Sequence, residues 1–434
     1  MRFTFPDYYP GFQCLAGSCP ATCCEDWQIV IDPASLRRYK STKGPFGRKL
    51  RRRIDWKDGV FRQKGRRCVF LNEENLCEMH IEAGAGMMCR TCRMHPRHVE
   101  VYDQEREIML ALSCPAAARL ILGTDKKAEF VSFEDEREEE ENEDFDFFLF
   151  SALQDTRQQM IVMLQDRRES ISLRLARVLA LAHDVQKRIE DEQIFEIGDT
   201  LEIHADPVHA ERIGEKIRSM AEGAPEKCRE SHLVFRKALL DKLARMEVLE
   251  EAWSADLARW RQMSRETVNA GTETAERRSE ADRGLDFAAL MHGLARSMAE
   301  EETCRAQSCQ NEGEEEVCRA PRGCQSAAKN ELAGMTGQAR AGAEKAHHGA
   351  GDGSRFEVMQ EQLAVYLLQT YFCSAVYDQR AYAKVKMAVL FVLFWREIAR
   401  LEELEADEER LMELAYRLSR ELEHSDVNLS RLQR

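Results

Sequence analysis

The sequence predicts a mainly α-helical protein in which a cysteine-rich N-terminal metal-binding domain packs on a helical domain that carries a low-complexity insertion. Three observations support this fold class. The 434 residues include only 10 prolines and 44% hydrophobic residues, a composition typical of helix-rich globular proteins. Nine of the 15 cysteines lie in the first 114 residues. Over most of the remaining chain, apolar residues recur at helical spacing.

Composition divides the chain into five segments, which differ in cysteine content, charge and apolar periodicity: residues 1–124, 125–146, 147–264, 265–355 and 356–434. The first is the cysteine-rich domain, and the second is an acidic linker with nine acidic residues in its last twelve. The third and fifth are the two parts of the helical domain. The fourth is a disordered insertion, because it holds too few apolar side chains to offset the entropy lost on ordering.

Helical spacing is clearest on either side of the insertion. Apolar residues at Leu173, Ala176 and Leu179 mark one face of a packed helix. Two long helices are expected after Phe356, joined near residues 377–380, and a last amphipathic helix is expected over residues 411–422. Within the insertion we expect one short helix near residues 285–298.

Charge is distributed unevenly along the chain. Residues 1–124 hold 20 basic and 14 acidic residues, a net charge of 20 − 14 = +6, so the remaining residues carry −14 − 6 = −20. Ten of the basic residues lie between Arg37 and Lys57. They are expected to form either a solvated helix face or a contact surface for an acidic protein or nucleic acid. Because phosphate contacts need positive charge, we do not expect a nucleic-acid partner for the chain as a whole.

No segment of the sequence predicts a membrane span. The first residues contain no apolar run of signal-peptide length, and the longest apolar stretch, residues 388–395, is far shorter than the roughly 20 residues that cross a bilayer. We therefore expect a cytoplasmic protein without a membrane partner. In a reducing compartment, dense cysteines indicate metal binding or catalysis and not disulfides.

The N-terminal cysteines follow an irregular spacing: Cys14-x4-Cys19-x3-Cys23-Cys24, Cys68-x8-Cys77, Cys89-x2-Cys92 and Cys114. Thiolates favour zinc or iron-sulfur clusters, and either site needs four donors. Only Cys89-x2-Cys92 has the spacing of a zinc knuckle, so the pattern favours a 4Fe-4S cluster, with zinc as the alternative. Buried free cysteines are the structural alternative for single positions, Cys89 above all. Four cysteines of the insertion form a further candidate set, at positions 304, 309, 318 and 324.

A radical reaction on S-adenosylmethionine normally requires a C-x3-C-x2-C triplet. Here Cys19-x3-Cys23 is followed directly by Cys24 and then by Asp26, so the third cysteine of the triplet is missing. The sequence therefore argues against a radical mechanism.

Several short motifs of the first 124 residues resemble the flagellin lysine-N-methylase family, part of a wider cysteine-rich group with zinc- or iron-chelating motifs. The motifs are Phe12-Gln-Cys14, Cys23-Cys24-Glu-Asp-Trp27, Cys68-Val-Phe-Leu-Asn72, Thr91-Cys92-Arg-Met-His-Pro-Arg97 and Leu112-Ser-Cys114-Pro. The resemblance resumes over residues 371–389. In the middle of the chain it is limited to a general helical pattern of apolar residues.

The resemblance implies an S-adenosylmethionine-dependent lysine N-methyltransferase that acts on flagellin and carries an iron-sulfur cluster. The motif cysteines that it assigns to the metal, four of them as direct ligands, are Cys14, Cys19, Cys23, Cys24, Cys68, Cys77, Cys92 and Cys114. Cys89 departs from the family pattern, and we treat it as incidental.

Methylation of lysine requires a neutral amine, although the ordinary lysine pKa near 10.4 keeps nearly all amines protonated at pH 7. The site must therefore desolvate the amine or supply a base, and it must hold a cationic sulfonium donor near aromatic faces or carboxylates. Arg93, His95 and Arg97 are candidates for the donor's carboxylate, and Tyr366 and Tyr371 for the border of its pocket. Structural roles are the alternative for each. The sequence identifies no catalytic residue and no oligomeric state.

Two other classes of function are compatible with the cysteines. One is a zinc or iron-sulfur module or adaptor without methyltransferase activity. The other is an oxidoreductase, which lacks support because the sequence has no flavin or nicotinamide fingerprint. The large helical portion after residue 145 favours the methyltransferase, since a chelating module would not need it.

Overall fold

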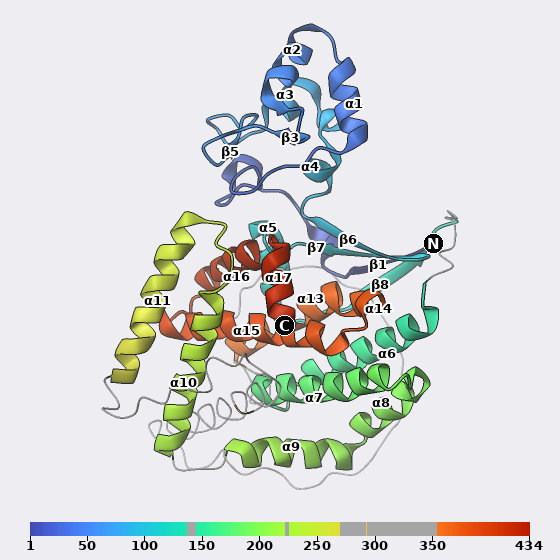
Figure 1. Ribbon diagram of the computed structural model, residues 1–434, viewed down its shortest axis with the longest axis vertical. Helices are drawn as coiled ribbons and strands as arrows, with labels where there is room; N and C mark the ends of the chain where they lie inside the picture. The colour runs from blue at the N-terminus through green and yellow to red at the C-terminus, as the bar shows by residue number, and fades with distance from the viewer. Residues whose placement is uncertain (137–144, 222–224, 270–291, 293–353) are drawn as a thin grey trace, which may run out of the picture.

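The computed structural model describes residues 1–136, 145–221, 225–269, 292 and 354–434. In Figure 1 a small N-terminal lobe lies at one end of a larger helical body, with a sheet beside their connection. Most of the insertion lies outside the described residues, including its four cysteines and, apart from residue 292, its expected helix. The centre of the acidic run, residues 137–144, also lies outside them.

The N-terminal lobe, residues 13–96, combines short helices with two-stranded ribbons. Its first helix begins at Pro33 because Asp32 caps it, accepting a hydrogen bond from the Ser35 backbone N–H at 2.9 Å. The strands pair as two antiparallel ribbons, β2 with β3 and β4 with β5. The elements are α1 (Pro33–Ser41), α2 (Gly44–Arg53), β2 (Ile54–Asp55), β3 (Val60–Phe61), β4 (Gln63–Lys64), β5 (Arg67–Cys68), α3 (Glu78–Ala83) and α4 (Arg90–Met94).

The lobe has a hydrophobic core of its own. Tyr39, Leu50 and Ile54 are fully buried in it, and Phe61 packs edge-on against Phe70 with ring centroids 5.3 Å apart. The Tyr39 hydroxyl satisfies its polar end by donating to the Met87 carbonyl at 2.7 Å. This core fixes the loops that carry the cysteines.

A four-stranded sheet follows the lobe and adjoins the helical body. The order is β6-β7-β1-β8, with β6 (Arg97–Tyr102) and β7 (Glu105–Leu110) as an antiparallel hairpin. The N-terminal strand β1 (Arg2–Pro6) runs parallel to β7 and antiparallel to β8 (Phe130–Glu134). No pattern in the sequence predicts this sheet, and β8 falls within the segment 125–146 expected to be an acidic linker.

Helices form the rest of the structure, which confirms the mainly α-helical prediction. Serine and aspartate side chains cap several of them; Ser354, for example, accepts from the Glu357 backbone N–H. The helices are α5 (Pro115–Leu122), α6 (Phe147–Leu164), α7 (Ile171–Glu190), α8 (Ile197–Ala205), α9 (Pro207–Ala221), α10 (Pro225–Leu243), α11 (Glu251–Asn269), α13 (Arg355–Tyr371), α14 (Ala375–Asp378), α15 (Ala381–Leu401), α16 (Glu408–Glu423) and α17 (Asp426–Gln433).

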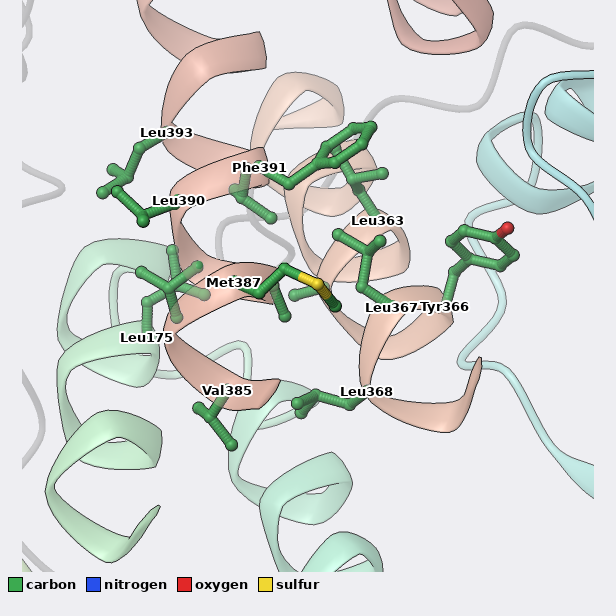
Figure 2. Close-up of a cluster of buried hydrophobic side chains, with 14 of the residues drawn as sticks. Leu175, Leu363, Tyr366, Leu367, Leu368, Val385, Met387, Leu390, Phe391 and Leu393 are labelled. Carbon is green, nitrogen blue, oxygen red and sulfur yellow. The ribbon is translucent and has the colours of Figure 1, made fainter. Parts of the chain in front are cut away.

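The main core joins the helical segments on the two sides of the insertion. Helices α13 and α15 pack against α6 and α7, and Figure 2 shows Leu363 and Leu367 of α13 beside Met387 and Phe391 of α15. Helix α15 is buried almost all round, as expected for a central helix. The two long helices meet at α14 and Gln379, where the sequence places their junction. None of the described helices is long and apolar enough to span a membrane.

Candidate functional site

Five of the predicted metal cysteines line one hollow in the lobe, here called the cysteine cavity. The cavity receives the side chains of Cys23, Cys24, Cys68, Cys77 and Cys92. Its remaining wall is formed by apolar and aromatic side chains together with one imidazole, from Trp27, Ile29, Phe61, Phe70, Met79, Met88 and His95. Thiols from four separate segments therefore converge on one largely apolar space.

Backbone pairing brings these segments together. The Cys68 N–H donates to the Cys24 carbonyl at 2.8 Å, which ties β5 to the Cys23–Cys24 loop. Cys77 pairs with Leu71 in an isolated β-bridge and caps the start of α3. Cys92 lies in α4, one turn after Cys89. The lobe's short elements thus position cysteines that are far apart in sequence.

The other three predicted metal cysteines lie outside the cysteine cavity. Cys14 follows the 3-10 turn Tyr9–Gly11, Cys19 donates its thiol proton to the Ala21 carbonyl at 3.3 Å, and Cys114 occupies the N-cap position of α5. Burial raises the pKa of Cys19 and of Cys114, and the neighbouring Cys23 raises both further. Cys19 and Cys114 therefore lie close enough to Cys23 to interact with it electrostatically.

Thiol protonation in the cavity follows burial and mutual hydrogen bonding. Burial raises the pKa of Cys68 to about 11. Cys89 and Cys92 are a coupled pair, in which a hydrogen bond between them lowers the pKa of Cys89 to about 7 and raises that of Cys92. Because metals bind thiolates, loading of this cavity would release protons. Cys89 is fully buried and does not line the cavity.

The chemistry of the cavity fits a soft metal centre, since cysteine sulfurs are the donors that zinc and iron-sulfur clusters share. Among the residues that the structure describes, however, no three cysteine, histidine, aspartate or glutamate side chains are arranged closely enough to hold a metal ion.

A second hollow, here called the junction cleft, lies between the lobe and the helical body. Cys23, Trp27 and His95 line both hollows, so the junction cleft adjoins the cysteine cavity. Its full lining is Cys23, Glu25, Asp26, Trp27 and His95 from the lobe and Leu249, Glu250, Arg420, Glu421 and His424 from the body.

Helix α16, at the body's end beneath the lobe in Figure 1, holds the two parts together. Its Arg420 donates to the backbone carbonyls of Ala21 and Thr22 in the lobe and to the Ser113 carbonyl at 3.2 Å. His424, which ends this helix, lies 3.0 Å from the Ser113 hydroxyl. The loop that carries Cys23 is thereby fixed against the C-terminal helices.

Histidines on both sides of the cleft flank the Trp27 indole. The ring centroids of His95 and His424 lie 6.0 and 5.7 Å from that of Trp27. Burial, together with the Arg420 charge, lowers the pKa of each imidazole to about 4. Both rings are therefore neutral at pH 7.

The residues that the sequence offers for donor binding lie apart from both hollows, except His95. Arg93 is exposed on α4, whereas Arg97 donates to the Tyr9 hydroxyl at 2.9 Å and stacks near Phe12. Tyr366 and Tyr371 are hydrogen-bonded to Glu423, and burial raises the pKa of both phenols. Tyr366 and Tyr371 therefore connect α13 to α16 through these hydrogen bonds.

Sequence reasoning missed the side of the cleft that the body contributes. Leu249 and Glu250 precede α11, and Arg420, Glu421 and His424 lie more than 300 residues from the cysteines that they face. The sequence signals were confined to the lobe side, where Cys23, Trp27 and His95 belong to the cysteine-rich motifs.

Comparison with known proteins connects the body's C-terminal helices to lysine methylation. Residues 354–434 match the FliB lysine N-methylase C-terminal domain, which here includes α16. The chain therefore resembles lysine N-methylases. This match confirms the resemblance expected from the sequence. Matches to curated relatives also support the resemblance. No solved structure matches the chain.

The curated relatives align over 128 residues, 27% of this chain, at 26% identity. They include the flagellar biosynthetic protein FliU of Salmonella muenchen, of which the alignment covers 76%. Two others are named lysine-N-methylase, from Salmonella typhimurium strain LT2 and Salmonella choleraesuis strain SC-B67, and the chain spans about a third of their length.

Proposed function

We propose that this protein is an S-adenosylmethionine-dependent protein lysine N-methyltransferase that acts on flagellin. The observation that carries the proposal is the position of α16. This helix belongs to the segment similar to the FliB lysine N-methylase domain, and it forms one wall of the cleft beside the cysteine cavity. The names of the relatives, one flagellar and two lysine methylases, support the substrate class.

The reaction requires no change of redox state. A neutral lysine amine attacks the methyl carbon of the sulfonium donor, the new N–C bond forms, and the S–C bond breaks with its electron pair left on sulfur. The product ammonium then loses a proton to a base or to water. The protein must bring both reactants together and must exclude the water that keeps the amine protonated.

The proposed metal centre is a 4Fe-4S cluster, with zinc as the alternative, in the cysteine cavity. Cys24, Cys68, Cys77 and Cys92 would hold it, because their side chains reach the cavity from four different segments. A cluster bound there would cross-link the lobe, which has only a small core of its own. Its proposed role is to order the loop that carries Cys23 and Trp27.

The direct test is transfer of a labelled methyl group. Protein purified without oxygen is incubated with methyl-labelled S-adenosylmethionine and with flagellin, and modified lysines are located by mass spectrometry. Flagellin with acetylated lysines is the matched control. Label on lysines of unblocked flagellin alone is the expected result.

The same preparation distinguishes the alternative function. A protein that binds iron or zinc, yet transfers no methyl group and is indifferent to the donor, would be a metal-binding module or adaptor. Iron, sulfide and zinc contents are therefore measured in parallel with transfer.

A further inference from the structure

Four acidic side chains line the junction cleft, from Glu25, Asp26, Glu250 and Glu421, beside the guanidinium of Arg420. Burial raises the pKa of Glu421 to about 7, so this carboxyl group is only partly ionised at neutral pH. The charge that the cleft offers a cation therefore depends on which of the other three carboxylates is not already paired.

These carboxylates differ in how far they are already satisfied. Glu25 is ion-paired with Arg67, and Asp26 with Arg66 at 2.6 Å. Buried Glu421 accepts the backbone N–H groups of Leu249 and Glu250 at 2.8 and 2.6 Å. The Glu250 side chain, in contrast, makes no hydrogen bond or ion pair with any residue that the structure describes. The Glu250 charge acts on Arg417 through space and raises the pKa of that guanidinium, but no direct contact with a described residue occupies the Glu250 carboxylate oxygens.

An aromatic surface lies beside this carboxylate. The Trp27 indole N–H donates to the Cys23 carbonyl at 2.7 Å, so the ring is held by its edge. The imidazole of His95, also in the wall, makes no hydrogen bond within the described part of the chain, whereas its backbone N–H donates to the Thr91 carbonyl at 3.0 Å. An indole face, an unpaired carboxylate and a free imidazole together form the kind of surroundings that bind an organic cation.

We propose that the junction cleft binds a reactant through a cation on an aliphatic chain, between Trp27 of the lobe and Glu250 of the body. Two reactants of the proposed function have this chemistry, the lysine ammonium and the donor sulfonium, and the inference rests on that function. The cation site is complete only when lobe and body are in contact, and Arg420 maintains that contact. It adjoins the cysteine cavity through Cys23 and Trp27.

The test is calorimetric binding of two probes, S-adenosylmethionine and Nα-acetyl-lysine amide, to the full chain. Glu250→Gln removes the unpaired charge and keeps the side-chain shape. Its matched control is Glu251→Gln, which changes the same charge one residue further on, at an exposed position outside the cleft. Loss of a charge-assisted contact predicts roughly tenfold weaker binding of one probe to Glu250→Gln. Binding to Glu251→Gln should change by less than about twofold.

A second pair of variants examines the aromatic face. Trp27→Leu should weaken the same probe, whereas Trp56→Leu, at an exposed tryptophan outside the cleft, should not. Circular dichroism verifies that each variant is folded. The probe that loses affinity in both cleft variants identifies the reactant.

The proposal is overturned if neither probe binds the wild-type chain, or if both probes bind Glu250→Gln as tightly as Glu251→Gln. Methyl transfer to flagellin is measured separately. Transfer with unaltered binding in Glu250→Gln would reject the cation site and leave the proposed function standing. Binding that depends on Glu250, without transfer to flagellin, would support the cation site and reject the proposed function.

Discussion

The buried carboxylate of Glu361 gives a sharp prediction about how the helical body is held together. Glu361 lies on α13 with its side chain fully buried. Two guanidiniums reach it, Arg167 through Nε at 3.0 Å and Arg174 at 2.8 Å. Because Arg174 lies on α7 and Arg167 just before it, this cluster joins helices from the two sides of the insertion.

Replacement of Glu361 by Gln should destabilise the protein strongly. The amide keeps the volume but removes the negative charge that Arg167 and Arg174, which are 10% and 1% exposed, share. Breaking a buried pair in this way costs about 3–5 kcal/mol of unfolding free energy. The assay is urea unfolding followed by circular dichroism, with the loss taken from the shift in midpoint at an unchanged slope.

The control is Glu196→Gln, which removes an equal charge from the more exposed pair with Arg188. That pair joins atoms 2.7 Å apart, but its side chains are 34% and 49% exposed. Its loss should cost about 0–1 kcal/mol. A loss in Glu361→Gln below about 1 kcal/mol, or equal to the control, would refute the reasoning that this buried charge cluster stabilises the body.

Three further predictions concern the core, the cysteine cavity and the cleft. Leu390→Ala, in the core of Figure 2, should lower the unfolding free energy by about 2–5 kcal/mol in urea titrations. Cys68→Ser should reduce bound iron or zinc, measured by elemental analysis, while Cys373→Ser, at a buried cysteine outside the cavity, should not; equal metal in both would exclude Cys68 as a ligand. Burial lowers the pKa of His424 from 6.5 to about 4, so between these pH values the unfolded chain binds a proton that the folded protein does not. The free energy of unfolding should therefore be highest above pH 6.5 and should fall as the pH is lowered towards 4. His424→Gln should flatten that dependence, and an unchanged pH profile of thermal unfolding would contradict it.

Helices could be predicted from the sequence because their evidence is local. Apolar spacing of three and four residues locates α7, α13, α15 and α16, and the turn near Gln379 separates two of them. The sheet could not be predicted in this way. Strand β1 pairs with β7 and β8, more than 100 residues away, and β8 lies within a segment whose charge suggested a linker.

The sequence by itself determined the mainly helical class, the cysteine-rich N-terminus and the resemblance to lysine N-methylases, because composition, periodicity and short motifs are properties of neighbouring residues. Only the tertiary structure decided which cysteines share a cavity and which side chains of α16 face them. Glu250 and Trp27 are more than 200 residues apart, and neither carries a pattern that refers to the other. Their proximity follows from packing of the lobe on the body, which depends on many weak contacts at once.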